Sequence, residues 1–235
     1  MPEISALKFE NVTVTLGTFR LSADLKVPDG SRVAIMGPSG SGKSTLLSLV
    51  AGFLASESGR IVWNGKDLSA MSPGDRPVSI LFQDQNLFPH LTVGQNVGLG
   101  LRPDLRLSPT QKAAVTAALD RVGLHDLADR RPAQLSGGQQ SRVALARVLL
   151  RSRPILLLDE AFAALGPALK DQMLDLLMEI ASETHATVLM VTHDPDDARR
   201  FAPLTIVVDQ GRAAPPMDTV ALLDDPPPGL RAYLG

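Results

Sequence analysis

The sequence feature that most constrains the fold is a glycine-rich loop set between an apolar segment, 31–36, and a helical pattern, 44–51. Glycines let successive backbone N–H groups point inward, and the following helix adds its positive N-terminal end. In such a loop Lys43 reaches the β- and γ-phosphates, and the Ser44 hydroxyl binds Mg²⁺. We therefore expect the phosphates of a nucleotide to be bound by Gly37, Pro38, Ser39, Gly40, Ser41, Gly42, Lys43, Ser44 and Thr45.

An apolar strand over 155–158 ends in two carboxylates, Asp159 and Glu160. At the carboxyl end of a parallel strand such groups face the ligand crevice. Asp159 would hold Mg²⁺, directly or through water. Glu160 would polarise the attacking water, because phosphoryl transfer needs positioning and charge compensation more than covalent help. Alone, the pattern fits a helix N-cap followed by a first-turn acid equally well; together with the glycine-rich loop it indicates phosphoryl transfer.

A pentapeptide between these two motifs forms a third candidate for phosphate binding: Leu135, Ser136, Gly137, Gly138 and Gln139. Ser136 can cap a helix while its hydroxyl and the N–H groups of the two glycines face outward, where an anion is favoured. The simpler alternative is an ordinary Ser-Gly-Gly loop that opens a helix.

The order of elements predicts an α/β chain with a helical insertion. Strand-like alternation over 8–14 and 21–27 and a hairpin signal at Asn64-Gly65 indicate antiparallel structure at the start. Helices are predicted over 108–123 and 139–150. Strands at 155–159, 187–191 and 204–208, with an amphipathic helix after the first, imply a parallel sheet. We expect the core to comprise 1–86 and 154–235, and the helical subdomain to comprise 87–153.

Composition narrows the classes of partner. The net charge of the 235 residues is −2, so no broad basic field points to nucleic acid as a partner. Cysteine is absent, which excludes disulfides and cysteine-bound metals. The apolar runs are far too short to span a bilayer, so in a transport system another chain would supply the channel.

Taken together, the three motifs resemble those of the ATP-binding-cassette (ABC) ATPases, over nearly the whole chain. The resemblance implies one domain over 1–235, with an α/β, RecA-like P-loop NTPase core, an N-terminal antiparallel β subdomain and an inserted helical subdomain. It implies that Glu160, His193 and Gln83 are catalytic and that Gln83 joins Ser44 and Asp159 at the metal. Alone, Gln83 would be read as a surface residue and His193 as a cap. ATP and Mg²⁺ are the implied cofactors.

The same resemblance assigns the pentapeptide 135–139 to the ATP held by a second copy, which implies a head-to-tail homodimer. The stretch 76–101 is similar to ATP-binding subunits of bacterial thiamine and thiamine pyrophosphate importers. Membrane permease subunits and, indirectly, a periplasmic substrate-binding protein are then the partners, and no nucleic acid is. The implied location is peripheral, on the cytoplasmic face of the bacterial inner membrane. Importers of iron, sulfate or polyamines share much of the pattern.

Three departures from the family pattern bear on mechanism. Leu16 stands where an aromatic residue usually stacks on adenine, with Phe19 nearby, and we expect reduced discrimination between ATP and GTP. The loop 161–166 lacks a serine and an aspartate, which predicts weaker coupling between the two sites. Gln140 and Ser141 replace an Arg-Gln pair, so one positive charge is missing near the site.

Other functions fit the sequence less well. A DNA-repair ABC ATPase would carry a long coiled coil between the loop and the pentapeptide, and a ribosomal one would carry two cassettes. A P-loop kinase or GTPase leaves 135–139 and His193 unexplained. A nucleotide sensor that does not hydrolyse ATP is favoured only by the altered loop 163–166.

Overall fold

The computed structural model describes residues 6–84 and 86–234. Gln85, in the stretch 76–101, lies outside the described residues, as do 1–5 and 235. The described chain divides into two compact units. The first unit comprises 6–78, 154–159 and 181–234, and the second unit comprises 79–153 and 160–180. Strand β6 (Val78–Phe82) and helix α5 (Pro167–Thr184) each begin in one unit and end in the other.

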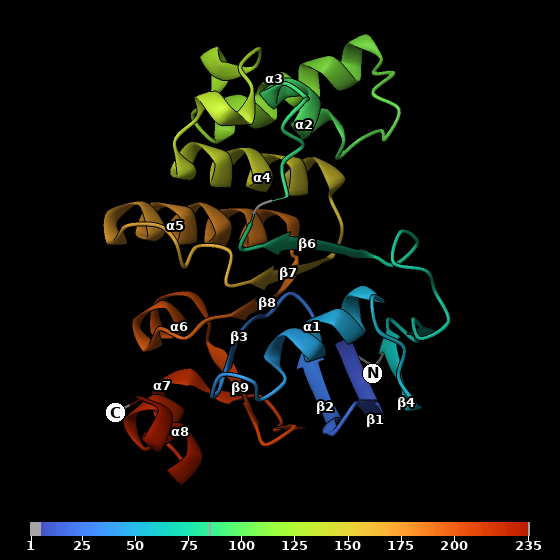
Figure 1. Ribbon diagram of the computed structural model, residues 1–235, viewed down its shortest axis with the longest axis vertical. Helices are drawn as coiled ribbons and strands as arrows, with labels where there is room; N and C mark the ends of the chain where they lie inside the picture. The colour runs from blue at the N-terminus through green and yellow to red at the C-terminus, as the bar shows by residue number, and fades with distance from the viewer. Residues whose placement is uncertain (1–5, 85, 235) are drawn as a thin grey trace. The chain divides into compact units, whose positions relative to one another are not determined.

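The first unit is built on one sheet, whose strands run in the order β5-β4-β1-β2-β10-β9-β3-β8-β7, with β11 paired to β9 (Figure 1). The strands are β1 (Ala6–Leu16), β2 (Phe19–Pro28), β3 (Arg32–Met36), β4 (Ser58–Trp63), β5 (Lys66–Asp67), β7 (Ile155–Asp159), β8 (Thr187–Val191), β9 (Leu204–Asp209), β10 (Arg212–Ala213) and β11 (Met217–Asp218). Its complete helices are α1 (Lys43–Ala51), α6 (Pro195–Phe201), α7 (Thr219–Asp224) and α8 (Pro228–Leu234).

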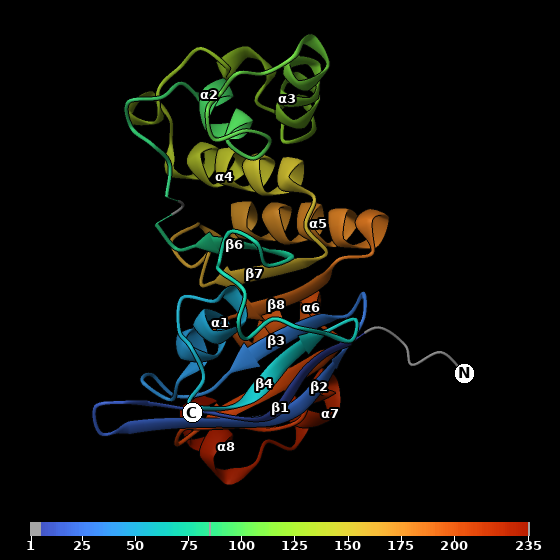
Figure 2. The same cartoon turned by 90° about the vertical axis from the view of Figure 1, so that its right-hand side faces the viewer.

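The N-terminal strands are antiparallel, as predicted. β1 pairs with β2 and with β4, and β4 turns back into β5 through Asn64 and Gly65. Both turn residues have positive φ, 49° and 75°, which is the geometry that an Asn-Gly hairpin supplies. Figure 2 shows β1 and β2 as a long hairpin ribbon in blue.

The remaining core strands, β9, β3, β8 and β7, are parallel, and the predicted α/β class with antiparallel and parallel parts is confirmed. β3 and β8 are buried almost throughout, because helices cover a parallel sheet on its faces. Ile35 and Asp159 both pair with Val191, so β3, β7 and β8 end in one row. Whatever follows these three strands is brought to the same edge of the sheet.

The second unit is mainly helical. It contains α2 (Val93–Gly98), α3 (Pro109–Arg121), α4 (Gly137–Arg151) and two short 3₁₀ turns, His125–Leu127 and Pro132–Gln134. Each of the three α-helices begins with a capping box, led by Thr92, Ser108 and Ser136. The predicted apolar face of α3 lies in the core of the unit together with α2, α4 and Leu135.

Sequence patterns did not reveal α2, β6, α6 or α7, which are only five to seven residues long and carry too few periodic positions.

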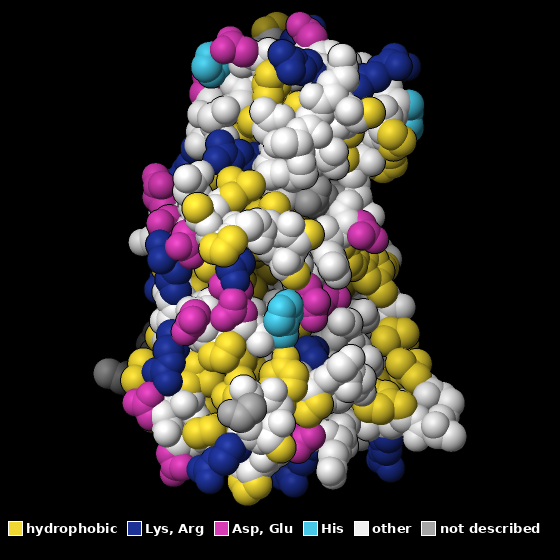
Figure 3. Space-filling view, turned by 60° about the vertical axis from the view of Figure 1, so that its left-hand side comes forward, with side chains coloured by type: hydrophobic (Ala, Val, Ile, Leu, Met, Phe, Trp, Pro, Cys, Tyr) yellow, Lys and Arg dark blue, Asp and Glu magenta, His cyan; other side chains and the backbone are white. Residues whose placement is uncertain are grey.

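Among the described residues, no helix is both long enough and apolar enough to cross a bilayer. On the face drawn in Figure 3, basic and acidic side chains are interspersed.

Candidate functional site

The phosphate loop joins β3 to α1 within the first unit. Gly37, Gly40 and Gly42 all have positive φ, at 146°, 75° and 110°. A Cβ on Gly37 would overlap the carbonyl oxygen of Val208, so this position admits only glycine. Gly42 is the N-cap of α1 and supplies no side-chain hydrogen bond to the start of the helix, where the positive end of the helix dipole favours an anion.

Two side chains of the loop fit a phosphate. Lys43 is 8% exposed and lies across the loop, where its Nζ donates to the carbonyl oxygens of Gly37 (2.8 Å) and Pro38 (2.9 Å). The Ser41 hydroxyl is buried and has no hydrogen-bond partner within the described chain. A buried hydroxyl without a partner is costly unless a ligand completes it. An inward ammonium, an unpartnered hydroxyl and an uncapped helix start suit the anionic tail of a nucleotide.

Ser44 and Asp159, from α1 and β7, meet at the carboxyl edge of the sheet. Ser44 Oγ donates to Asp159 Oδ1 across 3.1 Å. A hydroxyl and a carboxylate are hard oxygen ligands of the kind that Mg²⁺ takes beside phosphate oxygens. Within the described residues no cluster of three or more His, Cys, Asp or Glu side chains could hold a metal by itself. The hydroxyl and the carboxylate of the Ser44–Asp159 pair are thus oxygen donors that fit a cation bound beside phosphate.

His193 follows β8 at the same edge and is exposed. The two residues beside it are fixed. The Thr192 hydroxyl accepts from the Asp194 N–H (3.1 Å) and donates to Asp197 (3.2 Å), while Asp194 caps α6 by accepting from Asp196 N–H. Sequence reasoning missed this Thr-Asp-Asp network, although Asp194-Pro195 is a recognisable helix start.

Leu16 and Phe19, the two candidates for adenine contact, form a cross-strand pair at the end of the β1–β2 hairpin. Leu16 is 43% exposed and Phe19 is half-buried. The Phe19 ring lies against the phosphate loop. If Gly42 carried a Cβ, that atom would lie only 2.8 Å from Phe19 Cζ.

Gln83 and Glu160 belong to the second unit. Gln83 is exposed in the turn after β6. Glu160 has φ of 49°, in the left-handed region that non-glycine residues seldom adopt. Its carbonyl oxygen accepts from Ala163 N–H at 3.1 Å, so the chain turns sharply there. Strained backbone of this kind clusters at functional positions, since the surrounding structure must enforce it.

The pentapeptide 135–139 opens α4 in the second unit. Leu135 is buried in the helical core and anchors the segment. Ser136 Oγ accepts from Gln139 N–H (3.3 Å), and Gln139 Oε1 accepts from Ser136 N–H (2.9 Å). A Cβ on Gly137 would meet nothing within 4 Å, whereas one on Gly138 would overlap Leu169. The Gly137 side is thus open for a ligand, and the Gly138 side is closed by α5.

The two departures after the pentapeptide have structural partners that sequence reasoning missed. Gln140 Nε2 donates to the carbonyl oxygens of Pro132 (3.1 Å) and Leu135 (3.4 Å), and Ser141 Oγ donates to Gly137 O (3.1 Å). The polar side chains that replace the Arg-Gln pair therefore hold the start of α4.

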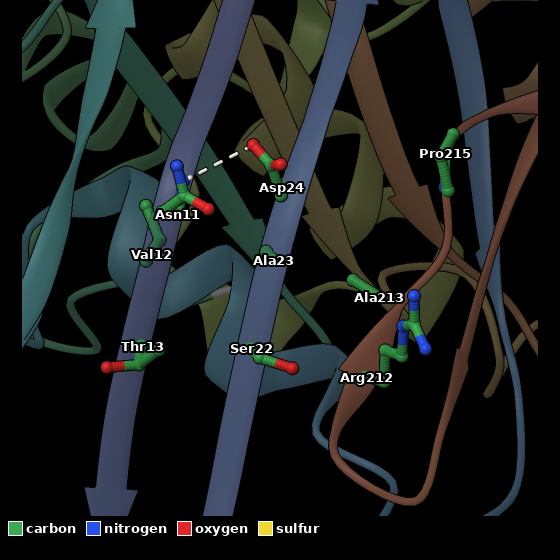
Figure 4. A pocket seen from close by; sticks show the side chains of 9 residues that line it. All are labelled: Asn11, Val12, Thr13, Ser22, Ala23, Asp24, Arg212, Ala213 and Pro215. Carbon is green, nitrogen blue, oxygen red and sulfur yellow. Dashed lines mark hydrogen bonds between the residues drawn. The ribbon is translucent and has the colours of Figure 1, made fainter.

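Each unit also contains a hollow of its own. In the first, a pocket of about 420 Å³ lies between the outward side chains of β1 and β2, among them Asp24, and the segment of Arg212 and Pro215 (Figure 4). Asp24 accepts there from Asn11 N–H at 3.3 Å. In the second, a groove of about 290 Å³ is lined by aromatic and basic side chains, including Phe82, Phe88, Arg147 and Arg151. Burial lowers the pKa of both of these arginines.

Comparison with known proteins places these features in one family. The family model described as ABC transporter matches residues 21–163. The thiamine import ATP-binding protein ThiQ of Cereibacter sphaeroides is 61% identical over 97% of this chain and 99% of its own. The protein of the same name from Ruegeria sp. is 57% identical with the same coverage.

A solved structure supports the same assignment. CbiO1 of Clostridium perfringens, described as part of the ABC transporter complex cbiONQ, superposes with a TM-score of 0.82 at 29% identity. The match covers 95% of this chain and 92% of that one. With the phosphate loop, the paired acids and the capped pentapeptide in place, the chain belongs to the ABC transporter family, as one of its ATP-binding, ATP-hydrolysing cassettes.

Proposed function

We propose that the chain is the ATPase subunit of a bacterial importer of thiamine or thiamine pyrophosphate, and that two copies close head to tail around ATP. The observation that carries the proposal is that the chain has a second helix start suited to a phosphate. Ser136 and Gln139 each accept a hydrogen bond from the backbone N–H of the other, and the Gly137 side of α4 is open. The phosphate loop already has a lysine and a helix start with which to bind phosphate. We therefore assign the second anion site, at 135–139, to the nucleotide held by a second copy of the chain.

The proposed division of labour follows the chemistry of the groups. Lys43 and the N–H groups at the start of α1 bind the β- and γ-phosphates, for which Lys43 leaves its two carbonyl acceptors. Glu160 holds the attacking water in line, and His193 contacts the γ-phosphate. Gln83 contacts the water and the metal. The partner's signature segment completes the charge compensation, so hydrolysis depends on closure.

Mg²⁺ would be held by Ser44, Asp159 and Gln83 and would neutralise charge on the phosphates. The donor chemistry of the Ser44–Asp159 pair supports this assignment. The hydrogen bond between these side chains holds Ser44 of α1 beside Asp159 at the end of β7.

Import requires a permease, and the groove of the second unit supports an interface for one. Phe82 directly precedes Gln83, Phe88 is 47% exposed, and Arg147 donates to Asn86 O (2.9 Å) at the groove. An exposed aromatic beside cations suits a partner helix with an apolar face and an acidic residue. We propose that membrane permease subunits dock there, on the cytoplasmic face of the inner membrane, and that a periplasmic binding protein delivers the substrate to them.

Thiamine is proposed because relatives at 61% and 57% identity over nearly the whole chain carry that name. Iron, sulfate and polyamine importers remain the competing assignment. Uptake by the chain reconstituted with its permease and binding protein distinguishes them, and thiamine uptake that depends on ATP is the expected result. ATP-driven uptake of another solute without thiamine would reassign the substrate and leave the ATPase assignment intact.

The head-to-tail dimer is tested by cysteine crosslinking. The sequence has no cysteine, so only the introduced thiols of this chain can react. One copy carries Ser39→Cys, at an exposed position of the phosphate loop, and the other carries Ala133→Cys, an exposed position just before the pentapeptide. In a Glu160→Gln background with ATP and the permease, a short bifunctional maleimide should join the two copies. Thr116→Cys on α3, also exposed, replaces Ala133→Cys as the control and should give no product. A product without ATP, or equal products from both pairs, contradicts closure around the nucleotide.

A further inference from the structure

Thr192, the residue directly before His193, is held through both its backbone and its hydroxyl just past the end of β8. Its N–H donates to Ile35 O at 3.3 Å, near the end of the strand that leads into the phosphate loop. Its hydroxyl accepts from Asp194 N–H (3.1 Å) and donates to Asp197 Oδ2 (3.2 Å). The residue is 6% exposed, so water competes little for these hydrogen bonds.

Helix α6, which carries Asp197, is itself held at its far end. Arg32 Nε, at the start of β3, donates to Phe201 O at 2.7 Å, and its guanidinium lies 5.8 Å from the centroid of the Phe201 ring. Ala198 and Phe201 are fully buried. The helix is therefore anchored to β3 at one end and, through Asp197, to the residue that follows β8 at the other (Figure 1).

These contacts define the backbone on both sides of His193. The residue before it is bound to β3 and to α6. The residue after it, Asp194, donates to the Thr192 hydroxyl and caps α6 by accepting from Asp196 N–H at 3.0 Å. His193 lies exposed between them. An exposed side chain on a fixed backbone can meet a ligand with little loss of backbone freedom on binding.

We propose that Thr192 is a positioning residue for His193. In this proposal the hydroxyl, held by Asp197, sets the turn from which the His193 ring reaches the γ-phosphate, and Thr192 touches no nucleotide itself. The inference rests on the proposed function, in which His193 makes that contact. A displacement of about 1 Å at a reacting group can cost roughly 100-fold in rate, so a small change in this turn is enough to slow hydrolysis.

A second threonine, at the other end of β8, provides a matched control. Thr187 is fully buried, and its hydroxyl accepts from Gly30 N–H (2.9 Å) and donates to Asp29 Oδ1 (3.4 Å). The two threonine hydroxyls thus make the same pair of contacts, with one backbone N–H and one aspartate. Only Thr192 adjoins His193. Removing either hydroxyl should lower the stability of the chain, and removing only that of Thr192 should slow hydrolysis.

Thr192→Val keeps the shape of the side chain and removes the hydroxyl. Phosphate release by the assembled transporter at saturating ATP should fall by roughly 10- to 100-fold. The isolated chain should still bind ADP, which has no γ-phosphate, within about twofold of wild type by calorimetry. Thr192→Ser, which keeps the hydroxyl, should retain most of the wild-type rate. Thr187→Val should hydrolyse ATP like wild type, although its urea midpoint should fall as that of Thr192→Val does.

The histidine rings give a second readout, which does not depend on turnover. The chain has four histidines, so selective isotope labelling gives four ring signals in an NMR spectrum, and His193→Ala identifies the signal of residue 193. In the isolated chain Thr192→Val should shift or broaden that signal, because the turn that carries the ring has changed. Thr187→Val should leave it in place.

The outcomes separate the inference from the function beneath it. Wild-type turnover in Thr192→Val, with hydrolysis lost in His193→Ala, overturns the positioning role and leaves the proposed function standing. An equal loss of turnover in Thr192→Val and Thr187→Val, or an unchanged His193 signal in Thr192→Val, also overturns it and shows that the hydroxyl only stabilises the fold. Wild-type turnover in His193→Ala contradicts the part that the proposed function gives to His193.

Discussion

Ser44 Oγ donates a hydrogen bond to Asp159 Oδ1 across 3.1 Å, which joins residues 115 positions apart in the sequence. The contact exists because β3 and β7 both flank β8 in register, so the start of α1 and the last residue of β7 reach one edge. It fixes two hard oxygen ligands side by side, a requirement for a cation that tolerates little distortion. The strand register therefore brings together two of the three residues of the proposed metal site.

Asp159→Asn separates charge from geometry at this pair. The amide oxygen can still accept from Ser44, so the free energy of unfolding should change by less than about 1 kcal/mol. Phosphate release by the assembled transporter should fall by about 100-fold or more, because the carboxylate proposed to hold the cation that neutralises charge on the phosphates is gone. Asp159→Ala removes charge and hydrogen bond together and is the comparison. Wild-type turnover in Asp159→Asn would show that the carboxylate is not needed.

The two glycines of the pentapeptide should respond differently to alanine. Gly138→Ala places a methyl group on the Leu169 side chain and should lower the free energy of unfolding by about 1–2 kcal/mol. Gly137→Ala meets open space and should stay within about 0.5 kcal/mol of wild type, by urea denaturation.

A double-mutant cycle identifies the cause. Adding Leu169→Ala should recover about 1 kcal/mol of the Gly138→Ala loss beyond additivity, because the overlapping atoms are gone. Additive losses would place the strain elsewhere in the first turn of α4.

Local motifs were predictable because their geometry is carried by adjacent residues. The loop 37–44, the cap at Ser136 and the strand end at Asp159 each follow from spacing within a few positions. The apolar face of α3 was predictable for the same reason, since its period repeats over three turns.

Contacts between distant segments were not predictable. The contacts of Phe19 with Gly42 and of Leu169 with Gly138 depend on how elements pack, and no sequence spacing encodes them. The sequence left open how Leu16 and Phe19 lie relative to one another, because only the pairing register shows that both are on one face of the hairpin.

Gly166→Asp should stabilise the chain. The Gly166 carbonyl oxygen accepts from the N–H groups of Leu169 and Lys170, so Gly166 stands at the start of α5. A Cβ there meets nothing within 4 Å, and an aspartate in this position can accept from the free N–H groups of the first turn. We expect a gain of a few tenths of a kcal/mol to about 1 kcal/mol in urea denaturation, relative to glycine.

The matched variant Gly166→Asn keeps the capping oxygen without the charge. It should give much of the same gain, since hydrogen bonding supplies most of an N-cap. If both variants are destabilised, the carbonyl geometry at 166 does not make an N-cap.

Arg76 is a buried guanidinium whose partners are backbone carbonyls. It is 2% exposed, and its Nη1 donates to Leu49 O (2.6 Å) and Val50 O (2.9 Å) at the end of α1, while its Nε donates to Met71 O (3.1 Å). Burial lowers the pKa of this group. The last carbonyls of a helix have no partner within the helix, so Arg76 satisfies groups that burial would otherwise leave unpaired.

Arg76→Met should therefore lower the free energy of unfolding by about 2–4 kcal/mol, and Arg76→Lys by less, because one ammonium reaches fewer of these oxygens. Arg60→Met is the control. Arg60 is an exposed arginine paired with Glu10, and its loss should change stability by no more than about 0.5 kcal/mol. Urea denaturation of the three variants makes the comparison. Equal midpoints for Arg76→Met and Arg60→Met would mean that water replaces the guanidinium at the end of α1, and that the phosphate-binding helix does not depend on it.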